Sequence, residues 1–312
     1  MTGTLKSYDG KLYPLPVLTQ YTVDTGDKEG CGSFYLRFAW DQAAAELLGQ
    51  AAEFTAVEAG ETVFTGIVDE VQLELDRQGL VAEVTGRSLQ ARLLDNQVVG
   101  TEFLTVHLED ILSRYVRPFG VSKIVADALP PLTGFLVETG SSAWQVLCGF
   151  CRHSAAVTPR MLPDGTLQIQ KNPAYRTWQV GKAAGYVSCR YRAKRYGRIS
   201  KQILVDQRKG TQTAAQNKAF LSQGGSRQAV TVQSGALLRA SWTTAEQRIA
   251  NAEREAECLE LTLPGGFLAW PGDRVEVSLE EMGIQQAYWV QSAMTELGAN
   301  GLICTVVLGK EN

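Results

Sequence analysis

The sequence predicts a mainly β (α+β) protein, with similar β domains at its two ends. Thirty glycines and recurrent turn dipeptides favour a strand-rich chain. Alternation of apolar and polar residues dominates both ends, whereas helical spacing is concentrated in the middle. With 312 residues, 45% of them hydrophobic, the chain has enough apolar material for two or three domains.

The first predicted domain spans residues 1–97 and contains a long hairpin. Residues 65–76 alternate, so we expect a buried face that carries Ile67, Val71, Leu73 and Leu75. The carboxylates of the opposite face are expected in solvent: Glu70, Glu74 and Asp76. Because neighbouring strand residues point to opposite faces, adjacent Asp69 and Glu70 cannot flank one bond as glycosidase carboxyl groups do.

A small α+β domain is predicted over residues 98–172. Helical spacing of Leu108, Ile111, Leu112 and Tyr115 indicates one helix. Ser142 and Gln145 have capping-box spacing at the start of a second helix. A hairpin turned at residues 163–165, Pro-Asp-Gly, completes the domain.

The remainder is predicted as two further parts. Residues 173–240 form a β segment, with 185–205 as its longest strand candidate and a long mobile polar loop over 206–235. Residues 241–312 contain a helix capped by Thr244 and Gln247, followed by a second β domain.

The two ends of the chain resemble each other. "GLVAEVTG" at 79–86 and "GLICTVVLG" at 301–309 each follow a turn and an alternating strand. This echo is what two copies of one β domain would leave.

The motifs of enzymes and metal sites are poorly represented. Cys148 and Cys151 have redox spacing and His153 lies nearby, but both cysteines lie late in the second predicted helix, on its apolar side. A structural zinc site would need a second ligand pair at short spacing, and the two histidines are too few for a multi-histidine site. We expect buried structural thiols, no catalysis and no cofactor.

Charge is segregated along the chain. Residues 41–110 carry 14 acidic side chains against 3 Arg, whereas residues 152–209 carry 13 basic side chains against 2 acidic ones. The densest basic run contains Arg190, Arg192, Lys194, Arg195, Arg198 and Lys201. It could bind phosphates. We favour an inter-subunit surface that meets the acidic segments of another copy.

"FTGIVDEV", a turn and "VTGRSLQARLLD" resemble the first β domain of baseplate hub proteins of contractile-tailed phages, Mu-like prophages and tailocins. The family pattern falls on Phe64, Gly66, Val68, Val71, Gly86, Arg87, Ser88 and Leu89. The resemblance implies two tube-type β-barrel domains that flank the small α+β domain and the further β segment.

The resemblance also implies a structural role and a set of partners. Three subunits would form a homotrimeric, pseudo-six-fold ring that joins a hexameric tail tube to a trimeric central spike. Wedge and tape-measure proteins and passing DNA are further expected partners. We expect assembly in the bacterial cytoplasm, no membrane-spanning segment, and a final place in the virion or tailocin particle. Alternatives are a peptidoglycan-binding or cell-wall-degrading tail-tip protein, a nucleic-acid binder through 190–209 and a redox protein through Cys148 and Cys151.

Overall fold

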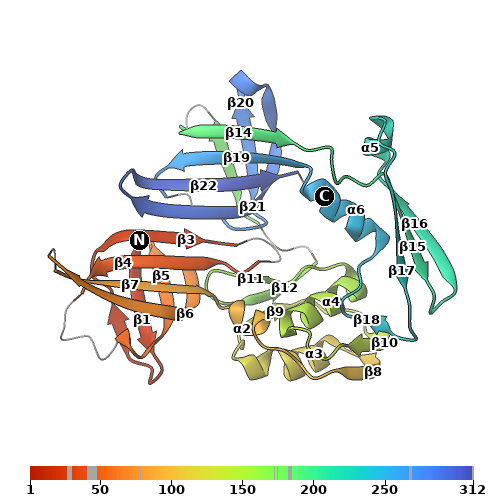
Figure 1. The fold of residues 1–312 in the computed structure, drawn as a ribbon, viewed down its shortest axis with the longest axis horizontal. Helices are drawn as coiled ribbons and strands as arrows, with labels where there is room; N and C mark the ends of the chain where they lie inside the picture. The colour runs from red at the N-terminus through yellow and green to blue at the C-terminus, as the bar shows by residue number, and fades with distance from the viewer. Residues whose placement is uncertain are drawn as a thin grey trace.

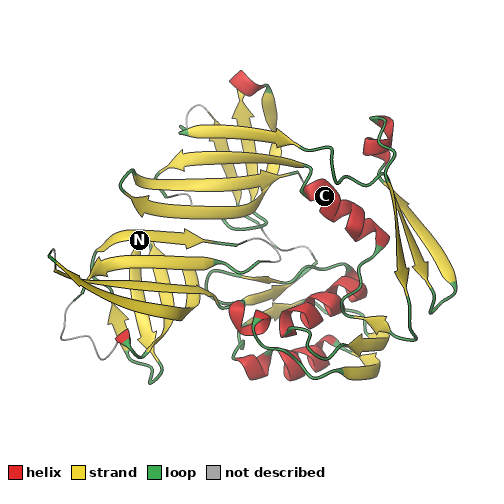
Figure 2. Cartoon of the chain, viewed as in Figure 1, coloured by secondary structure: helices red, strands yellow, loops and turns green. Residues whose placement is uncertain are grey.

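The structure is a computed structural model that describes residues 1–26, 30–40, 48–77, 79–171, 173, 175–181, 185–266 and 269–310. It is mainly β, as predicted, with two barrels, a small α+β module and a separate three-stranded sheet (Figure 1). The helices gather in and near the module, while strands form nearly all of both barrels (Figure 2). No helix within these ranges is long and apolar enough to span a membrane.

The first barrel is built from seven strands. They are β1 (Thr2–Ser7), β2 (Leu12–Pro14), β3 (Leu18–Asp24), β4 (Ser33–Ala39), β5 (Ala51–Glu58), β6 (Glu61–Asp76) and β7 (Gly79–Ser88). Its core contains three mutually packed rings, with the Phe34 centroid 4.6 Å from Phe54 and 5.7 Å from Phe64. Aromatic packing of this kind adds to the free energy gained by burying the rings.

A β-bulge in β6 determines which side chains of the hairpin face this core. Val68 pairs with Gly86 and Glu70 pairs with Thr85, so Asp69 is the extra residue. An extra residue reverses the alternation, so Val68 and Val71 lie on the same face. The predicted buried face is therefore wrong at Ile67, which lies on the opposite side of the strand from Val71.

Two glycines of the proposed family pattern let β6 and β7 approach closely. A Cβ on Gly66 would lie 2.3 Å from the carbonyl oxygen of Arg87, and one on Gly86 would lie 2.0 Å from that of Ile67. The Gly86 Cβ would also meet the Phe34 ring at 2.5 Å. Neither position can carry a side chain without movement of the backbone.

The α+β module follows the first barrel. Its elements are α2 (Ala91–Leu94), β8 (Thr101–Val106), α3 (Leu108–Tyr115), η2 (Arg117–Phe119), β9 (Ile124–Ala126), β10 (Leu132–Val137), α4 (Ala143–Ala155), β11 (Arg160–Met161) and β12 (Leu167–Ile169). Both predicted helices and the hairpin at 163–165 are present. Ser142 accepts a hydrogen bond from the Gln145 backbone N–H, 3.1 Å away, and the Gln145 side chain accepts one from Ser142, so the predicted capping box is confirmed.

The second barrel takes strands from two separate parts of the sequence. They are β13 (Thr177–Gly181), β14 (Ser188–Ala193), β19 (Glu257–Pro264), β20 (Arg274–Leu279), β21 (Ile284–Gly298) and β22 (Gly301–Gly309), with η3 (Glu280–Met282) between β20 and β21. Strand β13 runs parallel to β20, and β14 runs antiparallel to β19. Strands β13 and β14 thus belong to the same sheet as the C-terminal strands.

A projecting sheet, here called the arm, lies between β14 and β19 in the sequence. It contains β15 (Lys201–Asp206), β16 (Thr211–Gln216), α5 (Lys218–Ser222) and β17 (Gln228–Gln233), and the chain returns through β18 (Leu238–Arg239) and α6 (Ala245–Arg254). The predicted mobile loop over 206–235 is therefore wrong. Strand β15 lies in the centre and pairs with both β16 and β17, so backbone hydrogen bonds hold the sheet together although its side chains are small and polar. The long strand candidate 185–205 is divided, and Gly197 between its halves has φ +94°.

One sheet unites the two barrels. Its strands follow in the order β14, β19, β22, β21, β3, β4, β7, β6, with β5, β1 and β2 continuing beyond the first half of β6, and the joint between barrels is the antiparallel pair β21 and β3. Figure 1 shows the first eight of these strands stacked, with β14 and β6 at opposite ends of the stack.

The barrels repeat each other residue by residue along their longest hairpin. In β21 a bulge at Gln291 separates the pairs Val290–Leu308 and Ser292–Val307. Its position matches Asp69 in β6, 222 residues earlier, and seven pairs separate each bulge from its turn. The sequence echo between 79–86 and 301–309 thus corresponds to the matching strands β7 and β22.

Candidate functional site

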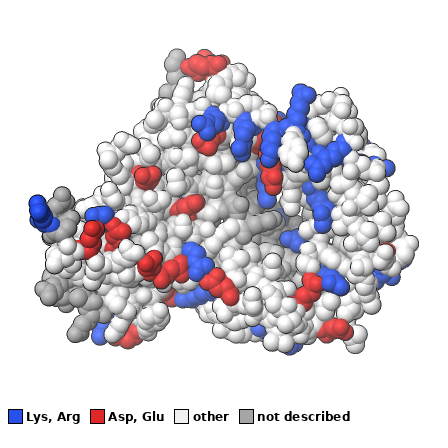
Figure 3. All heavy atoms as spheres, in the orientation of Figure 1, with Lys and Arg blue, Asp and Glu red and all other residues white. Residues whose placement is uncertain are grey.

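The edge strand β14 and the outer half of β6 are the first candidate site, because there the segregated charges reach the surface. Arg190 and Arg192 lie on β14, and Lys194 follows it directly. All three side chains are exposed, and none of them forms an ion pair with another described residue. Figure 3 shows Lys and Arg gathered over β14 and the chain that follows it.

The basic run does not form a single surface group. Arg195 is exposed beyond the end of β14, but Arg198 donates to both carboxylate oxygens of Glu253, at 2.8 and 2.7 Å. The Arg198 guanidinium also lies 4.1 Å from the centre of the Phe220 ring, which attaches α5 to α6. Lys201 begins β15 and is partly buried. Only the first four members are therefore free to meet a partner.

The acidic strand is β6, which six strands separate from β14 in the sheet. Glu70 and Glu74 are exposed there, so their predicted solvated face is confirmed, while the side chain of Asp76 lies outside the part of the chain that the structure describes. Glu74 lies 3.7 Å from Arg37, a long and exposed ion pair. Leu73 and Leu75, predicted to be buried, are 50% and 78% exposed because this half of the hairpin extends beyond the barrel core.

The remaining family-pattern residues have structural contacts. Arg87 forms ion pairs with Asp69 and Asp95, each at 2.7 Å, and so connects the bulge to the end of α2. Hydrogen bonds to the two carboxylates raise the pKa of the Arg87 guanidinium. Ser88 is buried, and Leu89 packs against the module. These contacts fix the first barrel on the module.

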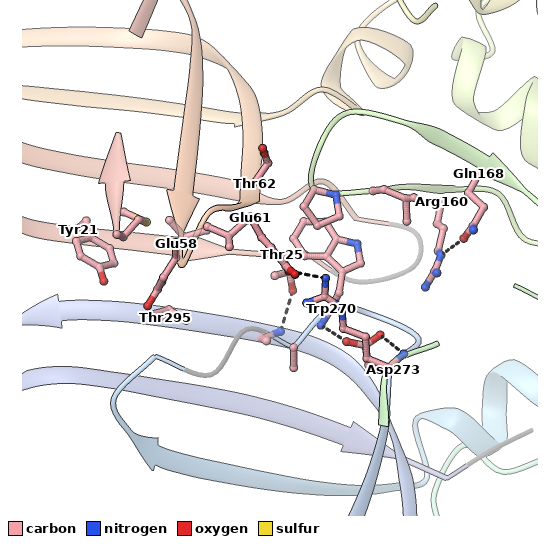
Figure 4. A pocket seen from close by; sticks show the side chains of 18 residues that line it. Tyr21, Thr25, Glu58, Glu61, Thr62, Arg160, Gln168, Trp270, Asp273 and Thr295 are labelled. Carbon is pink, nitrogen blue, oxygen red and sulfur yellow. Dashed lines mark hydrogen bonds and ion pairs between the residues drawn. The ribbon is translucent and has the colours of Figure 1, made fainter. Parts of the chain in front are cut away.

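A cavity of about 250 Å³ lies where both barrels meet the module hairpin (Figure 4). Buried Asp273 accepts hydrogen bonds there from the Trp178 side chain at 3.1 Å and from the Trp270 backbone at 3.0 Å. Arg160 donates to Gln168 at 2.5 Å and to the carbonyl oxygen of Pro271 at 3.1 Å. The hydrogen bond from Arg160 to Pro271 joins the module to the second barrel.

Two further carboxylates of the first barrel line the cavity. Glu61 forms an ion pair with Arg176 at 2.8 Å, while Glu58 lies on the same wall from strand β5. The Glu61–Arg176 ion pair therefore bridges the two barrels across the cavity.

The cysteine and histidine candidates lie in the module. Cys151 is fully buried in α4, and burial raises the pKa of its thiol, which disfavours the reactive thiolate. His153 is partly buried, and burial followed by the nearby Arg152 charge lowers its pKa to about 4. Among the described residues no group of three or more His, Cys, Asp or Glu is placed to hold a metal ion.

Comparison with known proteins identifies the fold. No protein-family model and no curated protein matches the sequence. A tail protein from Neisseria meningitidis MC58 has a solved structure that superposes with a TM-score of 0.78, at 20% identity, over 99% of this chain and 96% of its own. The 43 kDa tail protein of prophage MuSo2 from Shewanella oneidensis gives 0.74, at 18% identity, over 99% and 98%.

A secretion-system protein shares the same architecture more distantly. The E. coli c3393 protein, a type VI secretion component described as similar to the T4 tail proteins gp27 and gp5, gives a TM-score of 0.59 at 9% identity. It matches over 95% of this chain and 74% of its own. The chain therefore has the fold of phage tail proteins, and the predicted resemblance to baseplate hubs is confirmed at the level of fold.

Proposed function

We propose that this chain is a structural protein of a phage-type tail, and that it forms the hub at which the tail tube meets the central spike. The observation that carries the proposal is the repeat of one barrel within one sheet, with the same bulge and the same seven-pair hairpin in each copy. Solved phage tail proteins with this fold support it.

A duplicated barrel offers a way to connect assemblies of different symmetry. Three chains around an axis present six similar barrels, which suits contact with a hexameric tube. The arm and the module occur once in each chain, so the same ring is three-fold on the surfaces that they form. That arrangement suits a trimeric spike, and contacts between unlike barrels can close it.

The proposal assigns a particle location and no catalysis. A ring in a tail baseplate would be made and assembled in the bacterial cytoplasm, and DNA could pass through it in a particle that carries DNA. Wedge and tape-measure proteins would be its further neighbours. The engaged carboxylates of the central cavity agree with a structural role. Clearing of host cell wall in a zymogram with the purified chain would contradict this part.

Native mass spectrometry of the purified chain, alone and with tube and spike proteins, tests the ring. We expect a species of three copies, each of 34.0 kDa, that binds one spike trimer. Cryo-electron microscopy of the complex should then show six barrels around the axis. A chain that stays monomeric with both partners present would overturn the proposal.

A further inference from the structure

Strand β14 and the outer half of β6 each have an unpaired backbone edge. Within the described ranges β14 pairs only with β19, and residues 68–76 of β6 pair only with β7, because β5 reaches no further than Ile67. A free strand edge presents a row of N–H and C=O groups that another strand can pair with. Since six strands of the sheet separate β14 from β6, these two cannot pair within one chain (Figure 1).

The joint inside the chain shows how such edges pair. Strand β21, which matches β6, lies antiparallel to β3 in the pairs Met294–Asp24, Thr295–Val23, Glu296–Thr22 and Leu297–Tyr21. Strand β3 in turn matches β14. Strand β3 lies beside β4, which pairs with β7. In the same way β14 lies beside β19, which pairs with β22.

Following these ladders fixes the matching residues. Ser33 pairs with Arg87 and Asp24, while Cys258 pairs with Gly309 and Arg192. Arg87 and Gly309 are equivalent because they follow equivalent pairs at the bulges. Asp24 is thus equivalent to Arg192, and Tyr21, three residues earlier, is equivalent to Cys189.

We infer that β6 of one copy of this chain pairs antiparallel with β14 of the next copy, in the register of the internal joint. The internal pairs translate into Gln72–Arg192, Leu73–Tyr191, Glu74–Arg190 and Leu75–Cys189 between copies. Two residues further along, the same register sets Glu70 opposite Lys194. The inference rests on the proposed ring and specifies how its subunits join.

Charge favours this pairing. The acidic side chains Glu70 and Glu74 meet the basic side chains Lys194 and Arg190, and all four are exposed in the single chain. Opposite charges directly across an antiparallel pair stabilise the pairing, and like charges destabilise it. Two copies of β6 or two copies of β14 would place like charges together, so the charges favour the unlike edges and a head-to-tail ring.

Burial favours the same register. At the internal joint Tyr21 and Val23 are only 5% and 7% exposed. Tyr191, the counterpart of Val23, is 42% exposed and would lie beside Leu73. Cys189, the counterpart of Tyr21, is partly buried and would lie beside Leu75. Pairing in this register covers the exposed apolar side chains of both edges at once.

The inferred joint can be tested with one substitution, because Cys189 is already present. Leu75→Cys should form a disulfide with Cys189 of the neighbouring copy under mild oxidation, since directly opposed strand residues lie within the Cα range that a disulfide spans. Electrophoresis without reductant should show two- and three-copy products. Adding Cys189→Ser should remove them.

Two matched variants test face and register. Glu74→Cys, on the opposite face of β6, should give little product. Leu73→Cys should cross-link less than Leu75→Cys, and the reverse order would overturn the register. If native mass spectrometry shows the trimer but no Leu75→Cys product forms, the joint is wrong and the proposed ring stands. If no trimer forms with tube and spike present, the proposed function itself fails.

A charge-reversal cycle gives an independent measure. Glu74→Arg and Arg190→Glu should each raise the concentration for half-assembly about tenfold, and the double variant should recover most of the loss. Glu281 is exposed and lies away from both edges, so Glu281→Arg should change the concentration for half-assembly less than twofold. Losses that simply add in the double variant would overturn the Glu74–Arg190 pair.

Discussion

The two barrels differ most where the same hairpin meets a neighbour in one case and solvent in the other. Leu297 of β21 is partly buried beside β3, whereas its counterpart Leu75 on β6 is 78% exposed. The hairpins have the same bulge and length, so the strand itself does not account for the difference. An apolar residue exposed in one copy of a repeat and covered in the other points to a partner that the single chain lacks.

The barrels also fill their cores differently. The first leaves Gly66 and Gly86 without side chains and fills the space with the rings of Phe34, Phe54 and Phe64. At the positions equivalent to the two glycines the second has Tyr288 and Leu308, both fully buried. Close packing therefore makes each position specific to its own barrel, although the backbone is shared.

The largest expected effect comes from placing the second barrel's residue in the first. Gly86→Leu should destabilise the protein by about 4 kcal/mol or more, because even its Cβ would lie 2.0 Å from a backbone oxygen. Urea denaturation measures the change. Gly298→Ala, whose Cβ would have only a 3.4 Å contact with Glu296, should change stability by less than about 1 kcal/mol. Similar effects at both glycines would contradict the core comparison.

Removing bulk from the second barrel should have a smaller effect. Leu308→Ala should lower the free energy of unfolding by about 3 kcal/mol, since it leaves a cavity in a fully buried core. The same urea titration applies. A loss below about 1 kcal/mol would mean that the second barrel can collapse around the gap.

The equivalent leucines of the two hairpins separate stability from assembly. Leu297→Ser should cost about 1.5 kcal/mol of stability in dilute, monomeric protein, because it exposes part of the internal joint. Leu75→Ser should cost less than about 0.5 kcal/mol there, since that side chain is already in solvent. It should nevertheless weaken assembly in native mass spectrometry. Equal losses of monomer stability would refute the comparison.

The ion-pair network at the first bulge should give the smallest effect. Arg87→Ala should cost about 1 kcal/mol at pH 7, because partly exposed ion pairs are screened by solvent. Hydrogen bonding to Arg87 lowers the pKa of Asp95, so this stabilisation is present above the ordinary carboxyl pKa. It is lost as pH falls through the lowered value, and the gap between variant and parent should close below about pH 4.

A matched arginine serves as the control for that measurement. Arg274→Ala, which removes an exposed pair with Glu276 at 3.5 Å, should change stability by less than about 0.5 kcal/mol. A pH-independent loss in Arg87→Ala would show that the side chain acts by packing alone.

Local signals in the sequence predicted local structure well. The caps at Ser142 and Thr244, the helix over 108–115 and the turn at 163–165 each depend on residues only a few positions apart. The repeat was visible as an echo because both copies of the hairpin keep the same alternation. The spacing of Val68 and Val71, three residues instead of two, was the one available sign of the bulge.

Long-range pairing is what the sequence could not show. The sequence predicts a loop in place of the arm because the side chains there are small and polar, and the partners of its strands are set by the three-dimensional fold. Likewise, β13 pairs with β20 across almost a hundred residues. The sequence shows both the basic run on β14 and the acidic face of β6, but only the structure shows that both lie on unpaired edges of one sheet.

The insertion that holds the arm has its two ends side by side. Lys194 donates a backbone hydrogen bond to the carbonyl oxygen of Ala256 at 2.6 Å, while the matching connection of the first barrel is only residues 25–32. Loop closure entropy grows slowly with length, so the barrel tolerates a long excursion at this point. The connection between β14 and β19 is therefore a position at which the arm could be replaced by a short turn or by a foreign domain.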